Sequence, residues 1–156
     1  PSEFRGESEA ALEKTVREIG REYGVTTGRA RRCGYLDLVA LRYIVQANSI
    51  DALVLTHLDV YDGLDEVKAC VAYETEEQTL DTFPSSAYAL ERCRPVTRSF
   101  PGWSESLGTV RDYDHLPQNA RAYIDFIEQY VGVPVQIVSI GYERAQTIVR
   151  SDIWTR

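Results

Sequence analysis

The sequence predicts an α/β fold in which helices flank a mostly parallel sheet. Two segments, residues 7–23 and 118–131, carry apolar side chains at the three- and four-residue spacing of a helix with one buried face. Between them, residues 52–56 form a short, continuously apolar run that is typical of a buried parallel strand. The chain has 156 residues, of which 44% are hydrophobic, and this is enough for one core. We therefore expect a single domain over residues 1–156.

The first part of the chain predicts two helices with a basic segment between them. The helical spacing of residues 7–23 ends at Gly24, a residue type that favours helix ends. A second helix is expected over residues 36–47, where Asp37 would complement the positive end of the helix dipole. Because the basic residues 25–32 precede this helix, its free N–H groups should favour anions beside them.

The rest of the chain alternates strands with one further helix. Pro117 suits the first turn of a helix over residues 118–131. Pro101 and Gly102 predict a turn, and the polar residues 76–86 predict a loop. The expected strands are residues 52–56, 67–74, 94–100 and, closing the chain, 134–139.

Composition excludes several classes of protein. The formal net charge is -7, so no broad basic field is present for a nucleic acid. No apolar run approaches the roughly 18 residues of a membrane helix, and no secretion signal opens the chain. The three cysteines are never spaced as CxxC, which argues against a disulfide framework or a zinc site and favours a cytoplasmic setting. We expect these cysteines to be small buried residues.

One short segment is positively charged, although the chain as a whole is negative. Three of its last four residues are arginines, whose guanidinium groups pair bidentately with carboxylate or phosphate. A glycine within it allows a positive φ or the close approach of a ligand. The alternative is a solvated basic turn. The segment is Val25, Thr26, Thr27, Gly28, Arg29, Ala30, Arg31 and Arg32.

Several stretches of the chain resemble the adenylosuccinate synthetases. The resemblance runs through the whole sequence but covers only the last third of a family chain, so we expect a carboxy-terminal fragment or excised domain. It implies part of the P-loop GTPase-like fold of that family. The stretches that carry it are residues 33–43, 55–67, 100–103, 116–124 and 132–141.

The resemblance implies a GTP-dependent ligase of purine biosynthesis. In that family GTP phosphorylates the six-oxygen of IMP, and the amino group of L-aspartate then displaces the phosphate to give adenylosuccinate. Such chemistry needs a glycine-rich phosphate loop with its lysine and Mg²⁺. No such loop occurs in this sequence. We therefore expect no catalytic residue here, an inactive isolated fragment, Mg²⁺ bound mainly by the missing part, and a homodimer at full length.

The resemblance also assigns binding roles by position. The segment from Val25 to Arg31 would close over L-aspartate beside IMP, with Arg29 bridging aspartate and ribose and Arg31 pairing with a carboxylate near the GTP. Asp59 would accept two hydrogen bonds from guanine, although on spacing alone it could be a turn or capping residue. His57 stands where the family usually has lysine, and Ile140 where it has threonine or valine. The expected guanine site is His57, Leu58, Asp59, Ser139, Ile140 and Gly141.

Two other classes of function stay open. The chain could be a non-catalytic nucleotide- or anion-binding module, or an interaction domain that leaves its arginines in solvent. His115 precedes Pro117 and predicts a surface or capping role rather than catalysis.

Overall fold

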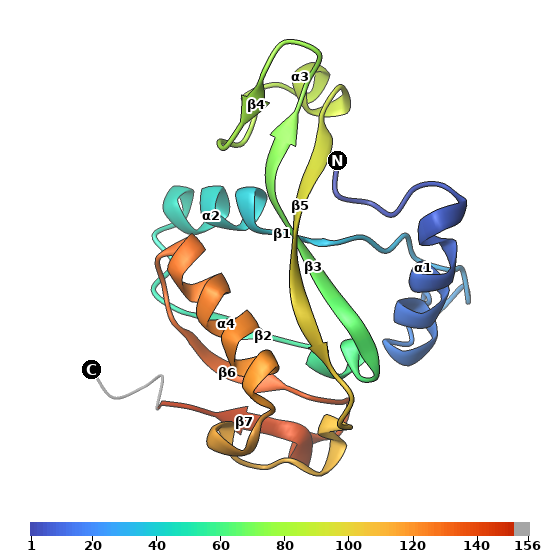
Figure 1. Ribbon diagram of the computed structural model, residues 1–156, viewed down its shortest axis with the longest axis vertical. Coiled ribbons are helices and arrows are strands. Elements are labelled where there is room, and N and C mark those ends of the chain that lie inside the picture. The colour runs from blue at the N-terminus through green and yellow to red at the C-terminus, as the bar shows by residue number, and fades with distance from the viewer. Residues whose placement is uncertain (152–156) are drawn as a thin grey trace. The chain divides into compact units, whose positions relative to one another are not determined.

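The computed structural model describes residues 1–151, which pack as two compact units. Each unit combines two separate stretches of chain (Figure 1). The first unit contains residues 1–43 and 68–99, and the second contains residues 44–67 and those from 100 onward. We describe each unit by itself.

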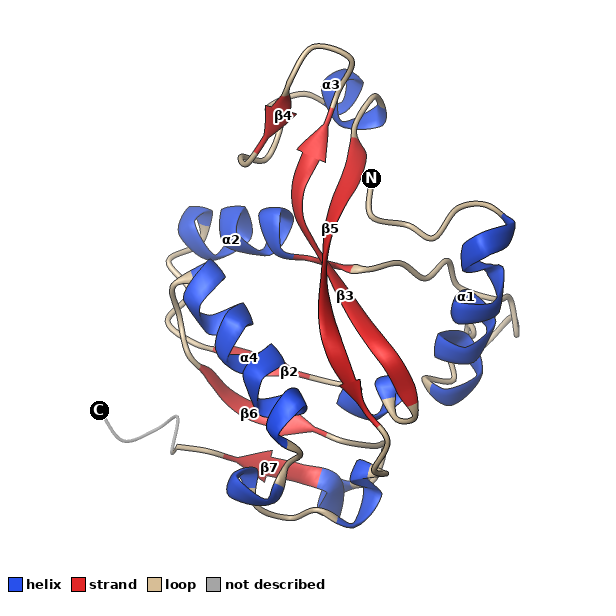
Figure 2. Cartoon of the chain, viewed as in Figure 1, coloured by secondary structure: helices blue, strands red, loops and turns tan. Residues whose placement is uncertain are grey.

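The first unit holds most of one mixed sheet. Strand β1 pairs in parallel with β3, and β3 pairs with β5 and antiparallel with β4 (Figure 2). Strands β3 and β5 and helix α2 continue into the second unit. The elements are α1 (Glu7–Ile19), β1 (Leu36–Asp37), α2 (Leu38–Ala47), β3 (Leu64–Glu74), β4 (Thr79–Leu80), α3 (Ala87–Glu91) and β5 (Arg94–Trp103).

The second unit contains a smaller mixed sheet. Strand β2 pairs in parallel with β6, and β6 pairs antiparallel with β7. Four 3-10 turns join or flank these strands. The elements are β2 (Leu53–Leu55), η1 (Leu58–Tyr61), η2 (Leu107–Thr109), η3 (Tyr113–His115), α4 (Gln118–Val131), β6 (Val135–Ser139), η4 (Arg144–Gln146) and β7 (Thr147–Val149).

The α/β class is confirmed, with a difference in how the strands are arranged. They form two mixed sheets, each with one parallel pair, and not one mostly parallel sheet. The expectation that residues 134–139 close the chain's regular structure is wrong, because β7 follows. The predicted turn at Pro101 and Gly102 is also wrong, since both residues lie within β5. A Cβ on Gly102 would lie 1.8 Å from the carbonyl oxygen of Leu64, so this strand position needs glycine.

The apolar face of the predicted helix contributes to the core of the second unit. Helix α4 begins after Pro117 and ends at Gly132, which takes a left-handed φ of 86°. Every apolar position predicted to share its face is buried: Ala120, Tyr123, Ile124, Ile127 and Val131.

A salt-bridged cluster ties the end of the described chain to this helix. Arg150 Nη1 donates to Glu128 Oε1 at 2.5 Å and to the Val135 carbonyl at 2.7 Å. The same carboxylate oxygen accepts the Val135 N–H at 2.6 Å. The Arg150 guanidinium also lies 3.9 Å from the centre of the Tyr113 ring, a cation–π contact. Arg150, the residue after β7, thus contacts α4, β6 and η3.

The first unit is closed by its N-terminal segment. The Phe4 N–H donates to the Cys33 carbonyl at 3.0 Å and the Tyr35 N–H to the Ser2 carbonyl at 2.8 Å. Between these bonds, a Cβ on Gly34 would lie 2.4 Å from the Ser2 carbonyl oxygen, so glycine permits the two backbones to pair.

Two of the predicted helices are shorter than expected. Helix α1 ends at Ile19, and Tyr23 instead forms an antiparallel bridge with Ala30. In the second, residues 36–37 form β1, and the helix proper starts at Leu38. A pair of strand residues is too short to show a strand periodicity, so the sequence pattern merged them with the helix.

All three cysteines are buried and free, as predicted: Cys33, Cys70 and Cys93. Among residues 1–151, no helix is long and apolar enough to cross a membrane.

Candidate functional site

The ends of two neighbouring strands form the first candidate site, which lies in the second unit. Leu55, the last residue of β2, is in parallel register with Val138 of β6. The segments that follow, Thr56 to Asp59 and Ser139 to Gly141, therefore leave the same edge of the sheet. Turn η1 also contacts β6. The structure thus brings together the two segments that the sequence predicted for guanine.

His57 makes the sharp turn from β2 into η1. Its φ is 57°, a left-handed conformation that is uncommon for a residue with a side chain. Its carbonyl accepts the Val60 N–H at 3.2 Å, which closes the turn. Leu58 is buried, so its side chain anchors the turn in the core and only its main chain could face a ligand.

Asp59 presents an acceptor that this part of the protein leaves unused. Its Oδ1 is buried and has no hydrogen-bond partner among the residues that the structure describes. Burial raises the pKa of this carboxyl, and the nearby Asp62 adds to the rise, whereas its own backbone N–H and His57 oppose it. A buried acceptor without a donor is costly, so the position is suited to a ligand that brings N–H groups.

The segment after β6 is more closed than predicted. Ile140 is 0% exposed, so its side chain belongs to the core. Ser139 Oγ donates to the Gly141 carbonyl at 2.7 Å. A Cβ on Gly141 would lie 2.2 Å from Oε1 of Gln146, so the glycine accommodates this carboxamide. Gln146 therefore covers Gly141 on that side, and the approach of a base to its main chain stays a prediction.

Gln146, which was not predicted to lie here, packs against the segment after β6. Its Oε1 accepts the Glu143 N–H at 3.1 Å, and its Nε2 lies 3.4 Å from the Gly108 carbonyl. Its own carbonyl accepts the Ile140 N–H at 2.9 Å. The Glu143-x-x-Gln146 spacing is that of a capping box, and this signal could have placed it.

The basic segment forms the tip of a short hairpin in the first unit. The Gly24 N–H donates to the Arg29 carbonyl at 2.8 Å, and the Arg31 N–H to the Glu22 carbonyl at 2.9 Å. Gly28 has a φ of 64°, and its N–H closes the turn on the Gly24 carbonyl at 2.8 Å. All of the predicted loop residues are exposed: Val25, Thr26, Thr27, Gly28, Arg29, Ala30 and Arg31.

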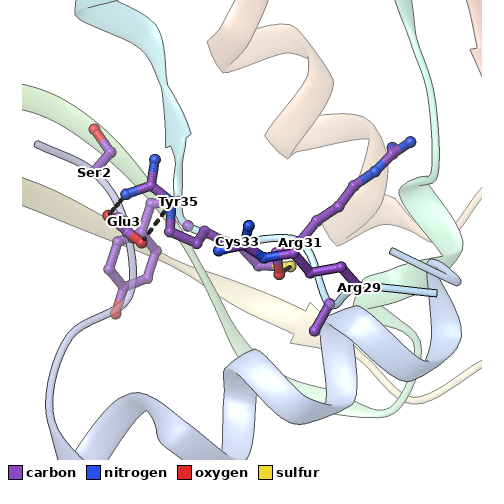
Figure 3. Close-up of a pocket in the computed structure, with 9 residues that line it drawn as sticks. Ser2, Glu3, Arg29, Arg31, Cys33 and Tyr35 are labelled. Carbon is purple, nitrogen blue, oxygen red and sulfur yellow. Dashed lines mark hydrogen bonds and ion pairs between the residues drawn. The ribbon is translucent and has the colours of Figure 1, made fainter. Parts of the chain in front are cut away.

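The three arginines of the segment have different surroundings. Arg31 pairs with Glu22 at 3.1 Å and Arg32 with Glu3 at 3.4 Å. Within residues 1–151, the Arg29 guanidinium has no ion-pair partner. A depression of about 730 Å³ runs along residues 29–35 and the N-terminal segment, with the Arg32–Glu3 pair drawn as dashed lines (Figure 3). This surface offers exposed cations to an anionic ligand.

The helix start that was predicted to favour an anion is occupied by a carboxylate of the protein itself. Asp37 occupies it, because its Oδ1 accepts the Ala40 N–H at 3.0 Å at the first turn of α2. The same carboxylate accepts a hydrogen bond from the Ser2 hydroxyl and one from the Tyr73 hydroxyl, which lies 2.8 Å from each of its two oxygens. A carboxylate with this many donors leaves no room for a second anion.

The described residues contain no cluster of three or more histidine, cysteine, aspartate or glutamate side chains that could hold a metal ion. His115 lies exposed in η3, at the surface position that the sequence predicted.

Comparison with known proteins gives consistent matches. A family model described as adenylosuccinate synthetase matches residues 1–148. The chain is 48% identical over 153 residues to an adenylosuccinate synthetase of Aquifex aeolicus, and this match covers 98% of the chain and 34% of the relative. It is 47% identical over 149 residues to one of Synechococcus, with 96% and 34% covered. The solved structure of a fully ligated adenylosuccinate synthetase from Plasmodium falciparum aligns with a TM-score of 0.87 at 37% identity, over 96% of this chain and 35% of that one. The chain thus spans about a third of the length of the relatives it matches.

Proposed function

The chain belongs to the adenylosuccinate synthetase family, and we propose that it supplies the guanine-recognition edge and the aspartate loop of such an enzyme. The complete enzyme would join IMP and L-aspartate, with GTP hydrolysis, to give adenylosuccinate, GDP and phosphate. We propose this chain as the carboxy-terminal portion. In support, the sequence contains no glycine-rich phosphate loop with its lysine, which the reaction needs elsewhere in the protein.

The unpaired Oδ1 of Asp59 is the observation that carries the guanine assignment. Guanine presents two donors on one edge, a ring N–H and an exocyclic amino group, and a carboxylate can accept both. Adenine does not present that pair of donors. The base would therefore satisfy the acceptor that the fold leaves buried, while the main chain of Ser139 to Gly141 lines the neighbouring strand end.

The exposed hairpin supports the second half of the proposal. Arg29 offers a guanidinium without an ion-pair partner among residues 1–151. The Arg31 side chain is exposed, although it pairs with the half-buried Glu22, so both guanidinium groups can turn to an incoming dicarboxylate. Gly28 and the hydroxyls of Thr26 and Thr27 lie at the tip of the same hairpin. L-aspartate matches this surface in charge.

We further propose that Mg²⁺ is held by residues outside this chain, since the described residues lack a suitable cluster. We also propose that the complete enzyme is a homodimer and lies in the cytoplasm.

Exchange of Asp59 for asparagine tests the guanine assignment. Asp59→Asn in the full-length enzyme replaces two acceptors by one acceptor and one donor, and should cost about 1–3 kcal/mol in GDP binding. Competition titrations of GDP against IDP and ADP should show that discrimination between the bases falls. Asp65→Asn, an exposed carboxylate of β3, is the matched control. An unchanged preference in Asp59→Asn would place the base elsewhere.

A non-catalytic nucleotide-binding module is the second candidate, favoured by the lack of a phosphate loop in this sequence. It predicts GDP binding by the isolated chain with no effect of L-aspartate on that binding.

A further inference from the structure

The two arginines that face the proposed ligand differ in what lies opposite them in the hairpin. Arg29 is paired with Gly24, which has no side chain. Arg31 is paired with Glu22, whose carboxylate reaches its guanidinium at 3.1 Å. Cross-strand neighbours of opposite charge attract each other on one face of a ladder. One arginine of the loop is therefore open, and the other already holds a carboxylate.

The main chain at Arg31 is fixed separately from this ion pair. Nε of Arg17, in α1, donates to the Arg31 carbonyl at 3.0 Å, and the Arg17 guanidinium also pairs with Glu13 one turn earlier. The hairpin bond from the Arg31 N–H to the Glu22 carbonyl does not involve the carboxylate. Loss of the Glu22 charge would thus free the guanidinium and leave the backbone of the loop in place.

We propose that Glu22 is an internal competitor for Arg31, a carboxylate that occupies the guanidinium until a carboxylate of the ligand displaces it. This inference rests on the proposed role of the loop in binding L-aspartate. The Arg31 side chain is 58% exposed and that of Glu22 is 30% exposed, so the pair can open without exposing any of the core. The displacement exchanges one carboxylate for another at the same guanidinium, and the released Glu22 carboxylate, which is already 30% exposed, passes to water. The competition lowers the apparent affinity for the ligand, because the pair must open first.

The size of the effect follows from the exposure of the pair. An exposed ion pair shifts an equilibrium by up to about fivefold. Added salt weakens such a pair, so the difference made by Glu22 should shrink as ionic strength rises.

The test is Glu22→Gln in the full-length enzyme, with IMP and GTP saturating. We expect the KM for L-aspartate and the inhibition constant of succinate, a plain dicarboxylate, both to fall by up to about fivefold at low salt. Glu76→Gln is the matched control, because it breaks the exposed Arg92–Glu76 pair of 3.3 Å in the same unit with the same change in charge. Its constants should stay at the wild-type values.

Two outcomes would overturn the inference. A rise in both constants would mean that Glu22 orients Arg31 for the ligand, and unchanged constants would mean that it does not compete. If Glu22→Gln fails to melt cooperatively, Glu22→Ala, which also removes the carboxylate, is read in its place by the same criteria. Arg31→Leu distinguishes the competition by Glu22 from the proposed binding of L-aspartate by the loop. If Arg31→Leu raises the KM for L-aspartate while Glu22→Gln has no effect, only the competition is refuted. If neither has an effect, the proposed aspartate loop fails as well.

Discussion

The indole N–H of Trp103 donates to Oδ1 of Asp62 at 2.9 Å, and the other oxygen of that carboxylate accepts the Leu107 N–H at 2.8 Å. Asp62 directly follows η1, the turn that contains Asp59. The backbone supports the same connection, because the Gly63 N–H donates to the Trp103 carbonyl at 3.0 Å. One carboxylate therefore fixes the segment after β5 beside the turn that presents the proposed guanine acceptor.

Removal of the Asp62 carboxylate should destabilise the second unit. Asp62→Ala leaves two donors on the buried residues Trp103 and Leu107 without partners, and should lower the free energy of unfolding by about 2–4 kcal/mol. Urea denaturation followed by circular dichroism measures it. Glu105→Gln, at an exposed neighbour, should change stability by less than about 0.5 kcal/mol. Equal effects of the two variants would show that the two hydrogen bonds contribute little.

The Arg31 side chain should matter for L-aspartate more than for GTP. Arg31→Leu in the full-length enzyme removes a charge-assisted pair to carboxylate, and should lower the apparent specificity for L-aspartate by about 2–4 kcal/mol. Arg31→Lys should restore only part of this, since an ammonium group lacks the planar fork. Steady-state kinetics with each substrate varied in turn give the comparison. Small, equal effects on all three substrates would mean that the loop is only a solvated turn.

The isolated chain should make no adenylosuccinate from GTP, IMP and L-aspartate, because its sequence has no loop to hold the triphosphate. A spectrophotometric turnover assay checks this. Turnover that rises in proportion to the purified chain would require another catalytic base within residues 1–156.

Tyr113 should contribute to the loss of stability at alkaline pH. Burial raises the pKa of its hydroxyl from 10.0 to about 12, with smaller contributions from Asp125 and Glu128 and opposition from Arg150. The unfolded chain ionises first, so the contribution is complete below pH 10 and is lost as the pH rises to about 12. Tyr113→Phe keeps the ring beside Arg150 and should show a shallower fall in unfolding free energy over this range, by urea denaturation. Identical slopes would contradict it.

The sequence predicted elements whose pattern is long enough to show a period. Helix α4 combines five apolar positions on one face with Pro117 before it and Gly132 after it. Strands β1 and β7 have two and three residues, and a period cannot be read from so few positions. Strand β2 was predicted to be buried, yet Val54 is 58% exposed, and β2 lies at one of the two edges of its sheet.

The candidate site was predictable in its positions but not in its hydrogen bonds. The sequence placed Asp59 at a strand end, and the parallel register of β2 and β6 confirms that its segment meets Ser139 to Gly141 at one edge. Only the folded structure shows that one oxygen of Asp59 is buried without a donor. The burial of Ile140 likewise depends on long-range packing, which residue types do not reveal.

The contacts of the Arg150 guanidinium should make three elements, α4, β6 and β7, open to solvent together. The bonds of this guanidinium to Glu128 and to the Val135 carbonyl must break when β7 separates from β6, and the Glu128 carboxylate, which also accepts the Val135 N–H, then loses its charged partner. Amide protons at the end of α4 and the start of β6 should therefore exchange with solvent together with those of β7, as one cooperative unit. A short edge strand would then be protected far beyond what its three residues of ladder could provide.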